Sequence, residues 1–119
     1  MKASILNLTT TSEAKDAMQA IDCTKAGIAI MQDKAIFKVI KFTQINTKAA
    51  NILQQTFLSK GGEVAISRHC AYLSKDTSDV IIMATIHQYK QAIPVLKMQP
   101  WKLKEVAANL EQIIAEYTK

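Results

Sequence analysis

Cysteine, glycine, proline and long apolar runs are all scarce in this sequence. Its 119 residues include two cysteines, three glycines and two prolines. The cysteines, Cys23 and Cys70, lie far apart and form no CxxC pair, which argues against a disulfide framework and a metal site and favours a cytoplasmic location. The apolar runs extend over only a few residues each, so we expect no membrane-spanning segment and no membrane partner.

Arginine is almost absent among the basic residues. Arg68 is the single arginine beside fourteen lysines, and with ten acids the formal net charge is +5. Bidentate recognition of phosphate and of guanine edges favours arginine, so this lysine excess indicates a solvated surface more than a nucleic-acid interface. Two acid-free lysine segments, 34–62 and 80–104, leave a basic binding face as an alternative, although few aromatic side chains accompany them for stacking on bases.

The rest of the sequence consists of short periodic segments. Its apolar content of 49% is enough for the core of one domain over residues 1–119. Thr10 and Glu13 have the spacing of a capping box, and Gly61 with Gly62 is typical of a helix end. The pattern predicts strand 2–8, helix 10–21, strand 27–31, strand 35–43, helix 46–60, strand 63–67, strand 80–85, a helix from residue 86 that Pro94 kinks or ends, and helix 103–117.

This order of elements resembles the split βαβ, or ferredoxin-like, arrangement with extra helices at the C-terminal side. We therefore expect an α+β fold built as a two-layer α/β sandwich. A mostly parallel three-layer arrangement is the alternative, because segment 27–31 is short for a strand.

Three reactive side chains follow the expected strand at 63–67: Arg68, His69 and Cys70. His69 is badly placed to act as a base for Cys70, because adjacent residues of an extended segment point to opposite faces. His87 follows the next expected strand, and ligands of open α/β sheets gather at such strand ends. The sequence therefore predicts no catalytic residue, and it leaves a small anionic-ligand or enzymatic site around these four residues as an alternative.

Segment 97–104, KMQPWKLK, joins the last two expected helices. A tryptophan at a helix start commonly packs on the core. Partner binding through Lys97, Gln99 and Trp101 is the competing interpretation, since these polar and aromatic side chains lie together in one connection.

Three segments, 46–68, 78–93 and 95–103, together resemble the N-terminal extension of dihydropteroate synthases from anaerobic Gram-positive bacteria. The most specific parts are AANIL at 49–53, GGEVAISR at 61–68 and KMQP at 97–100. In that family the extension precedes a catalytic TIM-type barrel that joins a pterin pyrophosphate to p-aminobenzoate. Two positions depart from the family's pattern: His69 stands where a glycine follows the Ser-Arg pair, and no glycine follows the aromatic residue, Trp101.

A chain of 119 residues cannot supply the eight strand–helix units of such a barrel. The resemblance therefore implies a non-catalytic accessory or interaction domain associated with folate biosynthesis. It also implies a protein partner, either a dihydropteroate synthase barrel or a second copy of the chain, and no cofactor.

Overall fold

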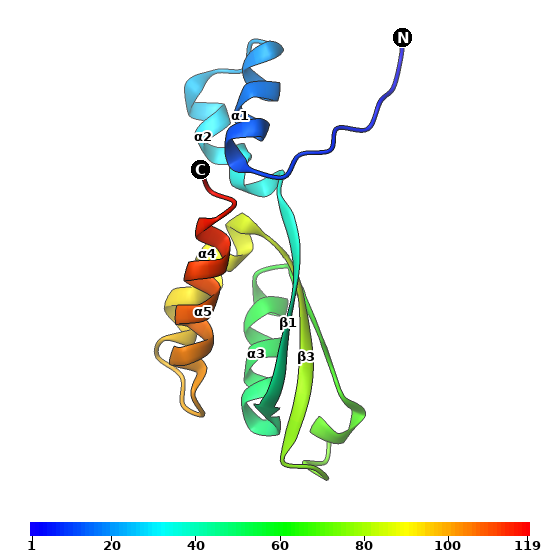
Figure 1. Ribbon diagram of the computed structural model, residues 1–119, viewed down its shortest axis with the longest axis vertical. Helices are drawn as coiled ribbons and strands as arrows, with labels where there is room; N and C mark the ends of the chain where they lie inside the picture. Colours follow the sequence, from blue (N-terminus) through cyan, green and yellow to red (C-terminus); the bar gives the residue numbers. More distant parts are fainter.

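The computed structural model describes residues 1–119 and contains five α-helices and three strands (Figure 1). The elements are α1 (Thr11–Ala20), α2 (Lys25–Met31), the 3-10 turn η1 (Gln32–Lys34), β1 (Phe37–Asn46), α3 (Thr47–Ser59), β2 (Glu63–Ile66), the 3-10 turn η2 (Arg68–Cys70), β3 (Thr77–Thr85), α4 (Ile86–Leu96) and α5 (Leu103–Ala115). None of the helices combines the length and the apolar character needed to cross a bilayer.

The three strands form one antiparallel sheet in the order β1-β3-β2. Because β1 and β2 both run opposite to β3, they are parallel to each other, and α3 connects them across the inserted β3. This is a split βαβ unit, so the predicted two-layer α+β fold is confirmed. The mostly parallel alternative is wrong, because both pairs of neighbouring strands are antiparallel.

The sheet is one strand short of a complete ferredoxin-like arrangement. There, the helix after β3 would lead to a fourth strand beside β1, just as α3 leads from β1 to β2 across β3. Here α4 is followed by α5 instead, and β1 pairs with β3 alone. The outer edge of β1 is therefore free.

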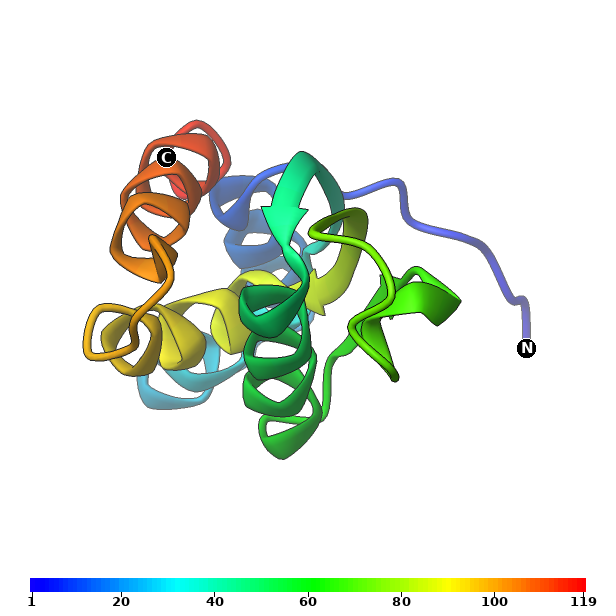
Figure 2. The ribbon, with the colours of Figure 1, turned by 90° about the horizontal axis from the view of Figure 1, so that it is seen from below.

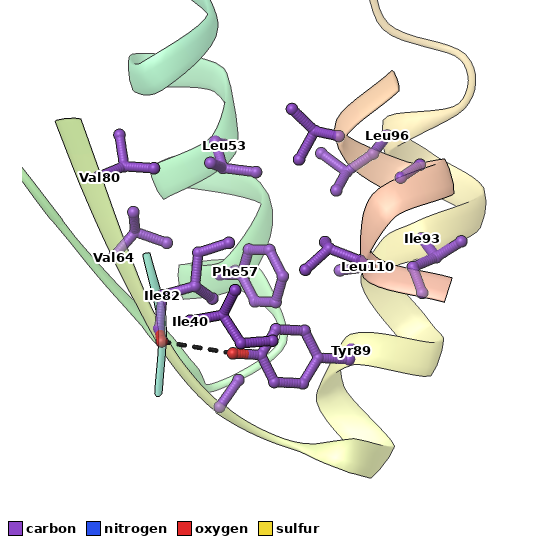
Figure 3. Packing of buried hydrophobic residues seen from close by; sticks show 14 of the residues in the cluster. Ile40, Leu53, Phe57, Val64, Val80, Ile82, Tyr89, Ile93, Leu96 and Leu110 are labelled. Atoms are coloured by element: carbon purple, nitrogen blue, oxygen red, sulfur yellow. Dashed lines mark hydrogen bonds between the residues drawn. The ribbon is translucent and has the colours of Figure 1, made fainter. Parts of the chain in front are cut away.

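The core lies between the sheet and helices α3, α4 and α5 (Figures 2 and 3). Phe57 of α3 and Tyr89 of α4 meet edge to face, with ring centroids 5.4 Å apart. The Tyr89 hydroxyl donates to the carbonyl oxygens of Lys38 at 2.8 Å and Ile82 at 3.3 Å. Burial raises the pKa of the Tyr89 phenol well above its usual value, so the ring is held neutral and hydrogen-bonded inside the core.

Two of the expected strands are absent. Residues 2–8 are extended but pair with no other segment, and residues 27–31 lie in α2. Thr24 caps α2, because its hydroxyl accepts from the Gly27 amide at 3.0 Å. A short apolar run becomes a strand only where another strand pairs with it, and neither segment has such a partner. Pro94 does not end its helix either, since it lies inside α4.

The molecule is elongated, measuring 53 × 29 × 22 Å. Helices α1 and α2 lie beyond one end of the sheet, close to the C-terminal residues (Figure 1). A hydrogen bond of 2.9 Å from the Thr11 amide to the Tyr117 carbonyl joins the two parts. At the opposite end lie the junction of β1 and α3, the loop 71–76 and the connection 97–102.

Candidate functional site

The second face of the sheet carries no helix, because α3, α4 and α5 all pack on the other side (Figure 2). Apolar side chains nevertheless point out of it: Val39 is 62% exposed, Phe37 57% and Ile81 38%. The strand register places Met83 beside Val39 and Ala65 beside Ile81, so these side chains are neighbours. We call the set Phe37, Val39, Ala65, Ile81 and Met83 the open-face stripe.

The open-face stripe is unusual for a face of an antiparallel sheet that meets water. Along such a strand, residues generally alternate between apolar ones on the buried face and polar ones on the solvated face. Contiguous exposed apolar patches in soluble proteins mark surfaces at which another protein or domain binds. The stripe is therefore the strongest candidate for a docking surface in this molecule.

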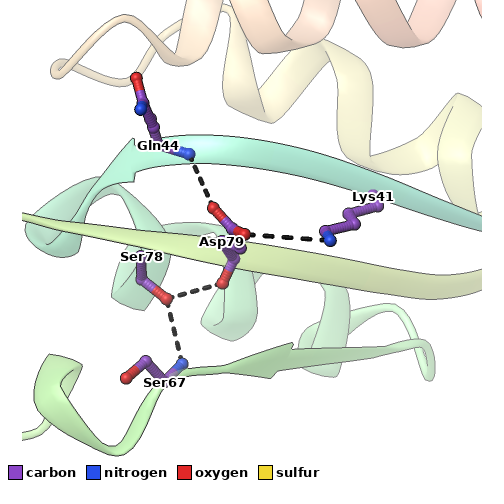
Figure 4. A network of polar contacts seen from close by, with 5 residues as sticks. All are labelled: Lys41, Gln44, Ser67, Ser78 and Asp79. Atoms are coloured by element: carbon purple, nitrogen blue, oxygen red, sulfur yellow. Dashed lines mark hydrogen bonds and ion pairs between the residues drawn. The ribbon is translucent and has the colours of Figure 1, made fainter.

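A polar network borders the stripe at the end of the sheet where β1 leads into α3 (Figure 4). The Asp79 carboxylate accepts a hydrogen bond from the backbone amide of Gln44 at 3.1 Å and lies 3.9 Å from Lys41 Nζ. The Ser78 hydroxyl donates to the Asp79 carbonyl at 2.6 Å and accepts from the Ser67 amide at 3.1 Å. These contacts tie together all three strands at this end.

Asp79 has a structural task in this network. Gln44 has a φ of 55° and lies where the β1–β3 register shifts between Phe42 and Ile45. A non-glycine residue in the left-handed region costs energy, and the hydrogen bond to Asp79 offsets part of that cost. The ion pair with Lys41 contributes little, because both side chains are more than half exposed.

His69 lies beside the same network. A surface hollow of about 430 Å³ is lined by Lys41, Ala65, Ile66, Ser67, His69, Lys75, Thr77, Ser78, Asp79 and Ile81. The His69 ring is held by its Nδ1 atom, 2.9 Å from the Ser74 hydroxyl, while its amide donates to the Ser67 hydroxyl at 3.2 Å. The hollow opens on the open face, so His69 belongs to the border of the stripe.

The structure does not support one shared site for Arg68, His69, Cys70 and His87. The first three lie in η2, where Arg68 is exposed while Cys70 is buried with its carbonyl accepting from the Asn51 side chain at 2.9 Å. His87 is the second residue of α4 and lies at the other end of β3, roughly 20 Å or more along the sheet. The sequence analysis expected Arg68 and His87 to meet because each follows a strand. They do not meet, because β2 and β3 are antiparallel and their C-terminal ends lie at opposite ends of the sheet. A ligand role for any one of these residues stays a prediction.

The three residues expected to bind a partner are separated as well. Lys97 forms an ion pair with Glu111 of α5, and Gln99 lines a hollow of about 450 Å³ against α3. Trp101 is exposed, at 46%, with the Lys48 ammonium 4.8 Å from its ring centroid. It is not a core staple, so a partner contact through Trp101 stays a prediction.

Trp101 lines a second hollow, of about 480 Å³, at the same end of the molecule as the Asp79 network. The hollow is lined by Thr43, Gln44, Ile45, Asn46, Thr77, Trp101, Lys102 and Glu105. Three of these residues, Gln44, Trp101 and Lys102, have positive φ. Strained backbone of this kind is concentrated at functional sites, and here it lies near the end of β1 and in the connection between α4 and α5.

Sequence reasoning missed the open-face stripe, although a signal for it exists. In segment 37–42, FKVIKF, apolar residues occupy both alternating sets of positions. A strand with one solvated face should be apolar at only one set. The second set, Phe37 and Val39, therefore indicated a face that needs cover.

The chain is similar to parts of longer proteins. It is 35% identical over 84% of its length to a probable bifunctional folylpolyglutamate synthase/dihydropteroate synthase of Halobacterium salinarum. The matched region is 12% of that protein. It is 29% identical over 82% of its length to a bifunctional dihydropteroate synthase/dihydropteroate reductase of Helicobacter pylori, of which the match is 26%. A Haloferax volcanii protein with the same name as the first is 28% identical over 60% of the chain and 8% of that protein.

The chain thus spans about an eighth to a quarter of the length of the first two curated relatives it matches. All three relatives have dihydropteroate synthase in their names, which agrees with the family resemblance of the sequence. They come from Halobacterium salinarum, Haloferax volcanii and Helicobacter pylori, so the narrower link to anaerobic Gram-positive bacteria stays a prediction. No protein-family model matches the chain. No solved structure matches it either.

Proposed function

We propose that the chain is a non-catalytic interaction domain that docks on a dihydropteroate synthase barrel through its open face. The observation that carries this proposal is the open-face stripe in a chain whose relatives hold the similar segment within much longer polypeptides. In those relatives, other parts of the same polypeptide are available to cover such a face.

The fold supports a place outside the barrel. A TIM-type barrel consists of parallel strands, each followed by a helix. The sheet of this chain is antiparallel, and β2 leads to β3 without an α-helix between them. A segment of this fold is an addition to such a barrel and not a portion of it.

Tethering allows a small patch to act as an interface. A short flexible linker raises the effective concentration of two joined domains to the millimolar range. A stripe of five apolar side chains, bordered by the Asp79 network, is then enough to keep the two domains docked for much of the time.

A titration tests this docking. The chain, labelled with 15N, is mixed with the dihydropteroate synthase barrel of the organism that encodes it, at concentrations up to about 1 mM because a tethered contact can be that weak. We expect shifts of amide signals in β1, β2 and β3, concentrated at the open-face residues. Absence of shifts at the highest concentration, or shifts confined to α4 and α5, would refute docking through this face.

Two lysine substitutions, one inside the stripe and one outside it, test which surface binds the barrel. Val39→Lys removes an apolar contact from the centre of the stripe, and we expect it to weaken binding about tenfold or more. Ile30→Lys is the control, because Ile30 is also 62% exposed but lies in α2, away from the sheet. Equal effects of the two substitutions would contradict the assignment of the open face.

A second candidate function is favoured by the length of the Helicobacter pylori relative. The 97 matched residues are 26% of that protein, so it has about 370 residues in all. A TIM-type barrel takes about 250 of them. The remaining 120 or so correspond in size to this chain, and the name of that relative includes a dihydropteroate reductase besides the synthase. This candidate makes the chain a reductase part that reduces dihydropteroate to tetrahydropteroate.

Turnover separates the two candidates. The purified chain is incubated with dihydropteroate and a hydride donor, by itself and together with the barrel, and tetrahydropteroate is measured. Product formation that requires the chain supports the reductase candidate. Binding to the barrel without any turnover supports the interaction domain and excludes the reductase reading.

A further inference from the structure

Residues 1–7 form an extended arm that leaves the body of the molecule beyond the end of the strands (Figure 1). Two of its apolar side chains are largely in water, with Ile5 88% and Leu6 63% exposed. No hydrogen bond connects the backbone of the arm to the rest of the chain. The arm is thus an apolar segment in strand-like conformation that lacks a partner strand.

The residues that follow the arm fix the direction in which it leaves. The amides of Thr9 and Thr10 both donate to Glu13 Oε1, at 3.2 and 3.0 Å, as part of the box that caps α1. Leu8 is partly buried against the core. With these contacts in place the arm leads away from the β1 strand of its own molecule (Figure 1), so a second molecule can receive the arm without any change.

The free edge of β1 offers the complementary half of such a contact. The Ile36 carbonyl accepts from the Ile86 amide at 2.9 Å, so it points to the side of β3. Because backbone groups alternate along a strand, Phe37, Val39 and Lys41 direct their N–H and C=O groups to the free edge. An edge of unpaired backbone groups is a template for one more strand.

We propose that two copies of this chain form a dimer by exchanging arms. The arm of each copy adds as a fourth strand to the free edge of β1 in the other copy, in the position that a complete ferredoxin-like sheet would fill. Each copy has both an arm and a free β1 edge. In a two-fold symmetric dimer, both arms therefore find a β1 edge and both edges receive an arm. This two-fold match is the reason to assign the arm to a second copy and not to a different protein.

The lengths of the two segments agree. Residues 2–7 span about 20 Å in strand conformation, which equals the length of the regular part of β1, residues 37–42. The irregularity between Phe42 and Ile45 sets the far limit of pairing. Ile5 and Leu6 would lie on opposite faces of the extended sheet, one continuing the open-face stripe and the other directed to the helices.

The first experiment measures mass in solution. Sedimentation equilibrium of the full chain over a range up to about 100 µM, a concentration suited to micromolar affinities, should show a dimer. The chain without residues 2–7 should be monomeric. Its melting temperature should match that of the full chain at concentrations too low for dimers, and should be lower than that of the full chain at concentrations where the dimer forms, because association stabilises the folded state. A mixture of the two chains should form a heterodimer of intermediate affinity, since the shortened chain still offers its edge to one arm.

Two proline variants of the arm distinguish strand pairing from simple apolar adhesion. Ile5→Pro and Leu6→Pro both act in a segment without hydrogen bonds to the rest of the chain, so neither should change the fold. Only one of the two positions directs its N–H to β1, and proline there removes an inter-strand hydrogen bond in each half of the dimer. We expect that variant to raise the dimer dissociation constant about tenfold more than the other.

A full chain that stays monomeric across this range would overturn the proposal. So would a dimer that persists after removal of residues 2–7, or equal effects of the two prolines. A monomer whose arm is required for binding to the synthase barrel would also overturn it, because the arm would then belong to another partner. None of these outcomes bears on docking through the open face, which Val39→Lys tests separately.

Discussion

Tyr89→Phe tests whether the buried phenol joins the sheet to the helical layer as the structure indicates. The substitution keeps the ring that packs against Phe57 and removes only the hydroxyl that donates to Lys38 and Ile82. Both carbonyls belong to paired strand residues, so neither is left without a donor. We expect the free energy of unfolding to fall by about 1 kcal/mol, the usual net value of one such hydrogen bond.

The same substitution has a pH dependence whose sign follows from burial. Because burial raises the pKa of Tyr89 in the folded state, the folded chain retains the phenolic proton at a pH where the unfolded chain releases it. Stability from this group is complete below the unfolded value of about 10 and is lost as the pH rises from there toward the folded pKa. The advantage of the wild type over Tyr89→Phe should therefore shrink above pH 10, by at most about 1.4 kcal/mol per pH unit.

Urea unfolding followed by circular dichroism at pH 7, 10 and 11 provides the measurement. All other ionisable groups are identical in the two chains, so their contributions cancel in the difference. Tyr72→Phe is the matched control, since its ring is largely exposed and the loss of its hydroxyl should leave stability nearly unchanged. A Tyr89→Phe chain as stable as the wild type at pH 7, or a stability difference that does not change above pH 10, would refute the reasoning.

Two further predictions concern the polar end of the sheet and the cysteines. Asp79→Ala should lower the free energy of unfolding by about 1 kcal/mol because it leaves the Gln44 amide without its acceptor, whereas Lys41→Ala should cost only a few tenths; comparable losses in urea unfolding would show that the ion pair matters more. A thiol reagent should modify the half-buried Cys23 in the native chain and Cys70 only on unfolding, since Cys70 is fully buried; mass spectrometry of the labelled peptides checks the order, and early labelling of Cys70 would contradict its burial.

Elements with local signals could be predicted from the sequence. Helix α3 has Asn46, which accepts from the Lys48 amide at 2.8 Å, at its start and the glycine pair at its end, and Gly61 has the positive φ of 86° that such an end requires. Helix α5 follows from its apolar repeat. Residues 2–8 and 27–31 were predicted wrongly, because whether an apolar run pairs as a strand depends on a partner distant in the sequence.

The candidate site was less predictable for the same reason. The expectation that Arg68 and His87 meet depends on the relative direction of β2 and β3, which no local pattern reports. Antiparallel pairing places the two residues at opposite ends of the sheet. The open-face stripe depends on a global property too, namely that α3, α4 and α5 all pack on the same face of the sheet. The sequence showed it only as apolar residues at both sets of positions in β1.

The strength of docking through the open face has to depend on whether the domain is tethered. A fused domain at an effective concentration of about 1 mM is half docked with a dissociation constant of 1 mM. A separate chain at about 1 µM needs an interface roughly a thousandfold tighter, which is about 4 kcal/mol more. The dimer proposed here could supply part of that difference, because two linked copies present two open faces. The dissociation constant of the 119-residue chain for the barrel, measured with and without residues 2–7, would therefore report how far arm exchange replaces a covalent linker.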